Sequence, residues 1–116
     1  MTQAIHAAHS ALLAFSQRLN VTAHNIANVN TPGFKKNQTV LENTHPTGVR
    51  LTVNREESPG TSIPSGDETG SLQESSNVSL DEEMVHLITT ESAFKANLKI
   101  IKAEDETLGN LLDCLG

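Results

Sequence analysis

Aromatic residues are scarce in this sequence of 116 residues, which holds three Phe, no Trp and no Tyr. A core must then come from Leu, Ile, Val and Ala, which favours helix-on-helix packing over a small enzyme core. The length allows one domain at most. No apolar run reaches membrane-spanning length, and the first residues lack the charged region, apolar core and cleavage site of a secretory signal. We therefore expect no membrane span and no cleaved signal peptide.

Cysteine and positive charge are also scarce. Cys114 is the single cysteine, so no internal disulfide can form. The net charge of −6 argues against nucleic acid as a partner. His6 and His9 could share a metal ion, but no Cys, Asp or Glu accompanies them in residues 1 to 36. Surface histidines are the favoured interpretation. Because no Ser, Cys, His and carboxylate cluster has catalytic spacing, we expect no enzyme, cofactor, metal site or small-molecule substrate.

The last forty residues carry the strongest pattern. Apolar side chains recur every three or four positions from Leu80 to Leu115, with Asn97 beside them and no Pro in the stretch. This period predicts a helix from about residue 80 to 114, roughly 50 Å long, with a coiled-coil seam. Ser79 and Glu82 have the spacing of a capping box at its start. The predicted seam comprises Leu80, Met84, Leu87, Phe94, Leu98, Ile101, Leu108, Leu112 and Leu115.

The first segment, from about residue 2 to 28, has a second stripe of the same period. Its large members include Leu12, Phe15 and Leu19, and Ala or Ser fills many other positions. Small side chains let another backbone approach closely, so we expect this helix to pack against the C-terminal one. Residues 1 to 36 carry Arg18, Lys35 and Lys36 and no acid, whereas the C-terminal segment is acidic. This difference is a weak hint of pairing.

A motif rich in asparagine follows the first helix. Its assembly residues are predicted to be Asn25, Ile26, Ala27, Asn28, Asn30, Thr31, Pro32, Gly33 and Phe34. Asn28 and Asn30 suit a helix end, and Pro32-Gly33 suits the centre of a type II turn, whose third residue needs positive φ. The turn would aim the chain that follows. Phe34 either contacts a neighbouring subunit or packs on its own, and the sequence leaves both interpretations open.

The centre of the chain differs in kind from its ends. Residues 48 to 55 alternate apolar and polar side chains, which predicts a strand, and residues 39 to 42 could pair with it. Residues 57 to 76 are dominated by Ser, Gly, Pro, Thr and acids, which predicts a mobile loop. The expected organisation is a helix and turn motif in 1–36, strands and loop in 37–76, and a helix in 77–116. The fold class is mainly α, with two antiparallel terminal helices paired as in a coiled coil and a β-hairpin centre.

Both ends of the chain resemble one family. The run from Asn25 to Lys36 is similar to the N-terminal motif of the bacterial flagellar basal-body rod and hook axial proteins. The run Asn77-Val78-Ser79-Leu80, together with Glu83-Met84-Val85, Phe94, Asn97 and Leu111-Leu112, is similar to that family's C-terminal segment. The matches cover about two thirds of the chain, in the right order. The short length most resembles a proximal-rod subunit of the C type.

The resemblance implies a structural protein of motility. Family members are not enzymes; their terminal helices pair and stack by self-assembly into the hollow rod of the bacterial flagellum. The implied partners are further copies, other rod subunits and the type III export apparatus, which exports the chain to the periplasmic rod without a cleaved signal. The alternative is a helical-hairpin adaptor or export chaperone that uses the same stripes to bind one partner. An adaptor would saturate at a fixed stoichiometry, whereas a rod subunit makes open head-to-tail contacts.

Overall fold

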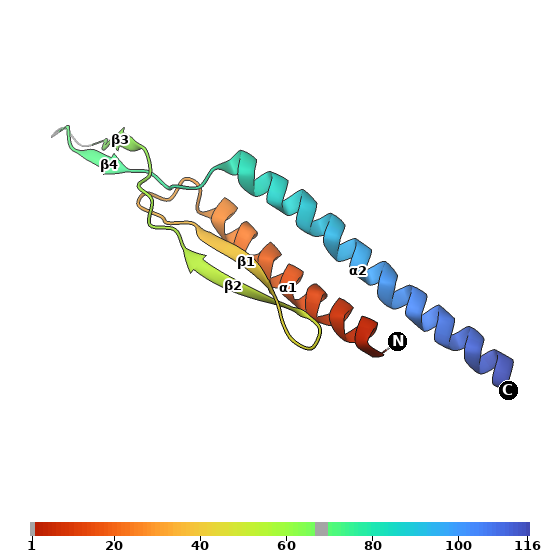
Figure 1. Ribbon diagram of the computed structural model, residues 1–116. Helices are drawn as coiled ribbons and strands as arrows, with labels where there is room; N and C mark the ends of the chain where they lie inside the picture. Colours follow the sequence, from red (N-terminus) through yellow and green to blue (C-terminus); the bar gives the residue numbers. More distant parts are fainter. Residues whose placement is uncertain (1, 67–69) are drawn as a thin grey trace.

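Two long helices dominate the computed structural model, which describes residues 2–66 and 70–116 (Figure 1). Helix α1 spans Thr2–Ala27 and helix α2 spans Leu80–Leu115. The chain termini lie at the same end of the molecule, so the two helices are antiparallel, as the sequence predicts. The result is an elongated molecule with extents of 81 × 24 × 14 Å.

Two small antiparallel sheets connect the helices. Strands β1 (Asn37–Asn43) and β2 (Val49–Arg55) form a hairpin in which Leu41 lies opposite Leu51. This confirms the strand and its predicted partner. Strands β3 (Ser62–Pro64) and β4 (Leu72–Glu74) form a second pair inside the predicted mobile loop. The expectation of an unstructured loop is therefore wrong for these residues, and residues 67–69 of that loop lie outside the described part of the chain.

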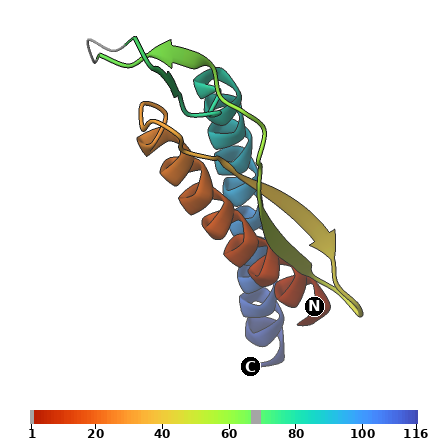
Figure 2. The same ribbon diagram turned by 90° about the vertical axis from the view of Figure 1, so that its left-hand side faces the viewer.

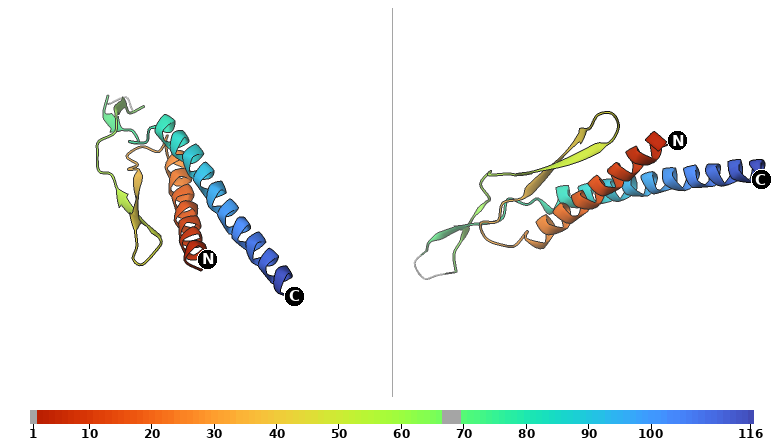
Figure 3. Two further views of the ribbon diagram at one scale, coloured as in Figure 1. Left: turned by 45° about the vertical axis from the view of Figure 1, so that its right-hand side comes forward. Right: turned by 90° about the horizontal axis from the view of Figure 1, so that it is seen from below.

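Helix α1 lies between the β1–β2 hairpin and α2. Figure 1 and the left view of Figure 3 show the hairpin on one side of α1 and α2 on the other, and in Figure 2 α1 crosses in front of α2. Both strands pack on α1, and α2 packs on α1 but on neither hairpin strand. Ser10 of α1 ties the hairpin down, because its hydroxyl accepts a hydrogen bond from the backbone N–H of Val49 at 3.1 Å.

The fully buried side chains of the two helices are small or polar. The buried residues of α1 are Ala8, Ala11, Ala14, Thr22 and Asn25, and those of α2 are Glu83 and Thr90. Alanine lets the two backbones approach closely but removes little apolar surface from water. Hydrophobic burial between α1 and α2 is consequently modest, and much of the aliphatic surface of α2 stays outside the contact.

Three of the nine residues of the predicted α2 seam face α1, and the other six are exposed. Leu87, Phe94 and Ile101 are partly buried toward α1, but Leu80, Met84, Leu98, Leu108, Leu112 and Leu115 are exposed. The contact stripe instead runs through Glu83, Leu87, Thr90, Phe94, Asn97 and Ile101. Hydrogen bonding to Asn25 holds Glu83 toward α1, which sets the rotation of α2 and turns Met84 outward. In α1, Leu12, Phe15 and Leu19 are partly buried, as expected.

Helix α2 is longer than α1 and continues past the N-terminus of α1 (Figure 3). All of its residues from Asp105 onward are exposed. We call residues 105–115 the α2 tail. Within the described ranges, neither helix combines the length and the apolar character that crossing a membrane requires.

Candidate functional site

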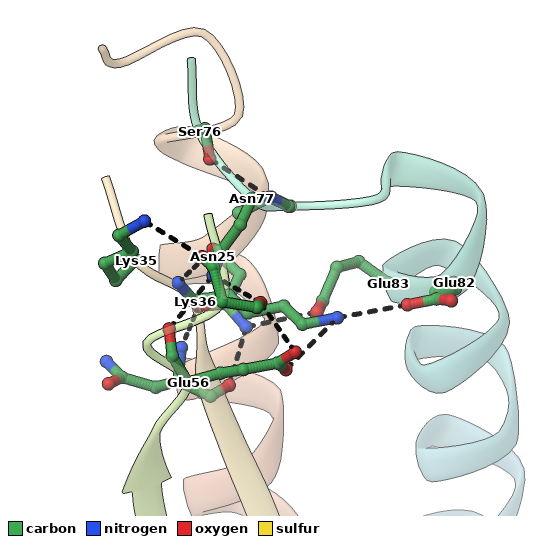
Figure 4. A network of polar contacts seen from close by, with 11 residues as sticks. Asn25, Lys35, Lys36, Glu56, Ser76, Asn77, Glu82 and Glu83 are labelled. Carbon is green, nitrogen blue, oxygen red and sulfur yellow. Dashed lines mark hydrogen bonds and ion pairs between the residues drawn. The ribbon is translucent and has the colours of Figure 1, made fainter. Parts of the chain in front are cut away.

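A buried asparagine joins three segments where α1 ends. Asn25 is 1% exposed, and its Oδ1 accepts from the N–H of Asn37 at 3.0 Å while its Nδ2 donates to the carbonyl of Asn37 at 2.8 Å. The same Nδ2 donates to Oε1 of Glu83 at 3.1 Å. Asn25 thus presents itself to β1 as a neighbouring strand would, and it also holds the first turn of α2 (Figure 4). We call Asn25, Lys36, Asn37, Asn77 and Glu83 the junction.

Asn77 acts as a second clamp just before α2. Its Oδ1 accepts from the N–H of Lys36 at 2.7 Å, and its Nδ2 donates to the carbonyls of Glu56 and Ser58 at 2.9 and 3.0 Å. Figure 4 shows Asn25 and Asn77 on either side of the same short piece of chain. An asparagine side chain carries both a donor and an acceptor group, so it can satisfy backbone groups of several segments.

Two lysines add ion pairs to the junction. Lys36 Nζ lies 3.1 Å from Glu82 and 3.6 Å from Glu56. Burial lowers the pKa of Lys36, but hydrogen bonding and charge from Glu82 and Glu56 outweigh that effect and leave the pKa raised. Lys35 contacts the Glu74 carboxylate, which also accepts from the N–H of Gly60 at 2.7 Å. The hydrogen bond from Lys35, followed by that from Gly60, lowers the pKa of Glu74.

These pairings overturn one detail of the sequence analysis. Ser79 does precede the first residue of α2, but its side chain makes no capping hydrogen bond. The capping box is therefore wrong. Glu82 reaches across to Lys36 instead of back to the N–H of Ser79, because an ammonium group is a stronger partner for a carboxylate than a neutral amide.

The turn after α1 has the predicted geometry. Gly33 has φ of 67°, and the N–H of Phe34 donates to the carbonyl of Thr31 at 3.2 Å. The hydroxyl of Thr31 donates to Oδ1 of Asn28 at 3.2 Å, which steadies the approach to the turn. Phe34 packs its ring edge-on against His24 at 5.5 Å, so the packing on its own subunit is observed. A contact of Phe34 with a neighbouring copy stays a prediction.

The remaining motif residues lie around the turn, and the side chain of Asn28 also donates to the carbonyl of His24 at 2.9 Å. Ile26 and Asn28 are partly buried, while Ala27, Asn30 and Pro32 are exposed. The structure therefore brings Asn25 together with α2 and leaves the rest of the motif at one end of the molecule. Sequence reasoning missed Asn37 and Glu83 as partners of Asn25, and Asn77 as the partner of the Lys36 backbone. The sequence did offer a signal. Asparagines occur in both segments that resemble the family, and their side chains can hydrogen-bond to backbone groups of other segments.

Helix α2 exposes a series of large aliphatic side chains along its length, which we call the exposed aliphatic residues of α2. They are Leu80, Met84, Val85, Ile88, Leu98, Ile100, Leu108, Leu111, Leu112 and Leu115, each at least 38% exposed. Scattered surface leucines are ordinary, but a series along one helix is typical of a protein interaction surface. The α2 tail holds four of these leucines.

A polar cavity lies between α1, α2 and β1. It has a volume of about 120 Å³ and is lined mainly by polar residues, among them Arg18, Lys36, Glu82 and His86. Arg18 and His86 lie 3.2 Å apart across it and link the two helices. Among the described residues, no three His, Cys, Asp or Glu side chains gather as metal ligands would.

Comparison with protein families identifies both ends of the chain. Residues 5–35 match the family described as flagella basal body rod protein, and residues 68–113 match the C-terminal part of the flagellar basal body rod FlgEFG proteins. The chain belongs to the flagellar basal body rod protein family. No curated protein sequence matches the chain.

The two matched regions meet in the junction. Asn25 comes from the first region and Asn77 and Glu83 from the second, and the hydrogen bond between Asn25 and Glu83 joins them directly. Rod proteins of this family are structural components of the flagellar basal body and are not enzymes. A structural role agrees with the large aliphatic side chains that α2 leaves exposed.

Proposed function

We propose that this protein is a structural subunit of the hollow flagellar rod and that it assembles through α1 and α2 with other copies and other rod subunits. The observation that carries the proposal is the placement of aliphatic side chains. The fully buried side chains of the two helices are alanines and polar groups, whereas ten large apolar side chains of α2 are exposed. Covering such a surface on association removes apolar area from water, which favours assembly.

The elongated shape supports the same proposal. Helix α2 has 36 residues and runs along the 81 Å long axis, so its exposed aliphatic residues can meet neighbours over roughly 54 Å of that axis. In this proposal, helices of neighbouring subunits pack against the side chains of α2 that α1 leaves uncovered. The proposed setting is the periplasmic rod, reached through the flagellar export apparatus without a cleaved signal. The proximal C-type position remains our expectation for this subunit.

Sedimentation velocity over a series of protein concentrations tests the proposal. Leu98 is exposed, whereas Ile101, three residues later on the same helix, faces α1. Leu98→Asp should keep the helix content and melting temperature of the monomer and suppress the growth of sedimentation coefficient with concentration. Ile101→Asp should lower the melting temperature, because it places a charge against α1.

An adaptor or chaperone would give another pattern. It would form a complex that saturates at one stoichiometry with a single partner, and its own size would not grow with concentration. If the sedimentation coefficients of the wild type and of Leu98→Asp increase equally with protein concentration, Leu98 lies outside the assembly surface. A wild type that remains monomeric at the highest concentration, also with other rod subunits added, would contradict the proposed function.

A further inference from the structure

The side chains that contact α1 continue past the end of α1. Leu87, Phe94, Ile101, Leu108 and Leu115 follow one another at intervals of seven residues on α2. The first three are partly buried toward α1, but Leu108 is 38% and Leu115 86% exposed. A heptad interval keeps side chains on one face of a helix. The α2 tail therefore continues the face of α2 that α1 covers at Leu87, Phe94 and Ile101. In the described structure, no other part of the same chain packs against this face of the tail.

An open hollow lies toward the opposite end of the molecule. It has a volume of about 340 Å³ and lies at the turn that follows α1. Phe34 and Pro32 supply apolar surface and Arg55 supplies positive charge, while the Lys35 ammonium is paired with Glu74. The complete lining is His24, Thr31, Pro32, Gly33, Phe34, Lys35, Asn37 and Arg55, which includes no acidic side chain.

The charge of the α2 tail is opposite to that of the hollow. From residue 103 to the end, the sequence holds four acidic residues and neither Lys nor Arg. Arg55 does lie 3.2 Å from Glu57, but both side chains are well exposed, and such a pair contributes little and exchanges its partner readily. Leucines with flanking acids on the tail thus complement an aromatic and basic hollow at the turn.

We propose that the α2 tail of one copy docks against the turn hollow of the next copy, which rests on the proposed rod function. The α2 tail lies at one end of the long axis and the turn lies toward the other, where β3 and β4 extend beyond it (Figure 1). If a second copy is shifted along this axis, its turn comes to lie beside the α2 tail of the first copy. There it covers the part of α2 that α1 of the first copy does not reach. Two different surfaces are joined, so each contact leaves a free tail and a free hollow, and the stack can grow without closing.

Cys114 allows a direct test, because it is the single cysteine and lies exposed in the α2 tail. Thr31→Cys places a second thiol at the rim of the hollow, on an exposed residue. A short bismaleimide added to concentrated full-length protein should then give a ladder of dimers, trimers and higher species. Thr31→Cys with Cys114→Ser should give at most dimers, since one thiol per chain cannot extend a ladder.

A matched control separates end-to-end contact from contact along the sides. Glu42→Cys places the second thiol on an exposed residue of β1, away from the turn, while Cys114 is kept. A ladder with Thr31→Cys but not with Glu42→Cys supports the proposal, and raising the salt concentration should weaken that ladder. A ladder with Glu42→Cys alone, or a Thr31→Cys variant that gives only dimers, would overturn it.

Cross-linking in isolated flagellar basal bodies tells the two proposals apart. If the Thr31→Cys subunit is present in the rod but its introduced thiol forms no link to Cys114 of another copy, tail docking is wrong and the rod function stands. A link from the introduced thiol to a different rod protein would mean that the hollow receives another subunit, which also overturns docking between copies. Absence of the subunit from the rod would contradict the proposed function, and the ladder in solution would still decide the contact.

Discussion

Asn25 and Asn37 exchange two hydrogen bonds, one in which a side-chain oxygen accepts from a backbone N–H and one in which a side-chain amide donates to a backbone carbonyl. This pairing attaches the first residue of β1 to the last turns of α1. Because Nδ2 of Asn25 also donates to Glu83, a single side chain sets the positions of α1, the hairpin and α2.

Asn25→Ala should therefore be strongly destabilising. It would leave the N–H and carbonyl of Asn37 and the carboxylate of Glu83 without this partner, at a cost of about 3 kcal/mol. The free energy of unfolding in urea measures the loss. Asn20→Ala is the matched control on the same helix, since Asn20 is exposed, and it should change stability by no more than about 0.5 kcal/mol. Equal effects of the two substitutions would show that Asn25 does not organise the junction.

Gly33 should tolerate asparagine better than valine. Its φ of 67° is strained for a β-branched residue, whereas a Cβ there would meet no atom within 4 Å. The cost is thus conformational, and Gly33→Val should lower stability by about 1–2 kcal/mol, while Gly33→Asn should cost less. Thermal melting compares the two variants. Gly109→Ala in α2, where space is also open, should be neutral or stabilising, because alanine favours a helix.

Glu74 should link stability to acidic pH. Its pKa is lowered from 4.5 by Lys35 and Gly60, so its contribution is present above pH 4.5 and disappears as the pH falls through the folded-state pKa. The difference in melting temperature between wild type and Glu74→Gln should consequently be positive at neutral pH and vanish in strong acid. Nuclear magnetic resonance titration should show the pKa of Glu74 rising toward 4.5 in Lys35→Met. A difference that persists in strong acid would mean that the carboxylate charge is not its source.

Thr90→Val should stabilise the monomer. Thr90 is 1% exposed, and its hydroxyl finds no hydrogen-bond partner among the described residues. Valine has nearly the same shape and removes the unpaired polar group, which should add about 1 kcal/mol to the free energy of unfolding. Thr89→Val serves as the comparison, since the exposed Thr89 hydroxyl donates to the carbonyl of Val85 at 2.9 Å. A destabilised Thr90→Val would indicate that a bound water satisfies the hydroxyl.

Sequence alone predicts the elements well and their rotation poorly. The period of apolar residues located both helices, and the Pro-Gly pair located the turn at Gly33, because these features depend on local chemistry. Most of the predicted α2 seam was wrong, because Leu98, which is exposed, and Ile101, which faces α1, belong to the same apolar pattern in the sequence. An assembly subunit keeps apolar residues for its neighbours, so period alone cannot say which of them face α1.

The junction illustrates a second limit. Asn77 and Asn25 are separated by more than fifty residues, and only the fold brings them to the neighbouring backbone groups of Lys36 and Asn37. The Lys35–Glu74 contact likewise depends on β4, which forms inside a stretch whose composition predicts a loop. Long-range pairing of backbone groups, rather than local propensity, orders this segment.

The central claim is that the protein is a building block of the rod, and locating it in isolated basal bodies tests that claim. A Glu42→Cys, Cys114→Ser variant can carry one biotin label on an exposed residue of β1, away from the exposed aliphatic residues of α2. Electron microscopy with a streptavidin–gold marker should place the label on the rod of basal bodies from motile cells. Basal bodies that assemble without any label, with the protein recovered as a soluble complex of fixed stoichiometry, would contradict the account.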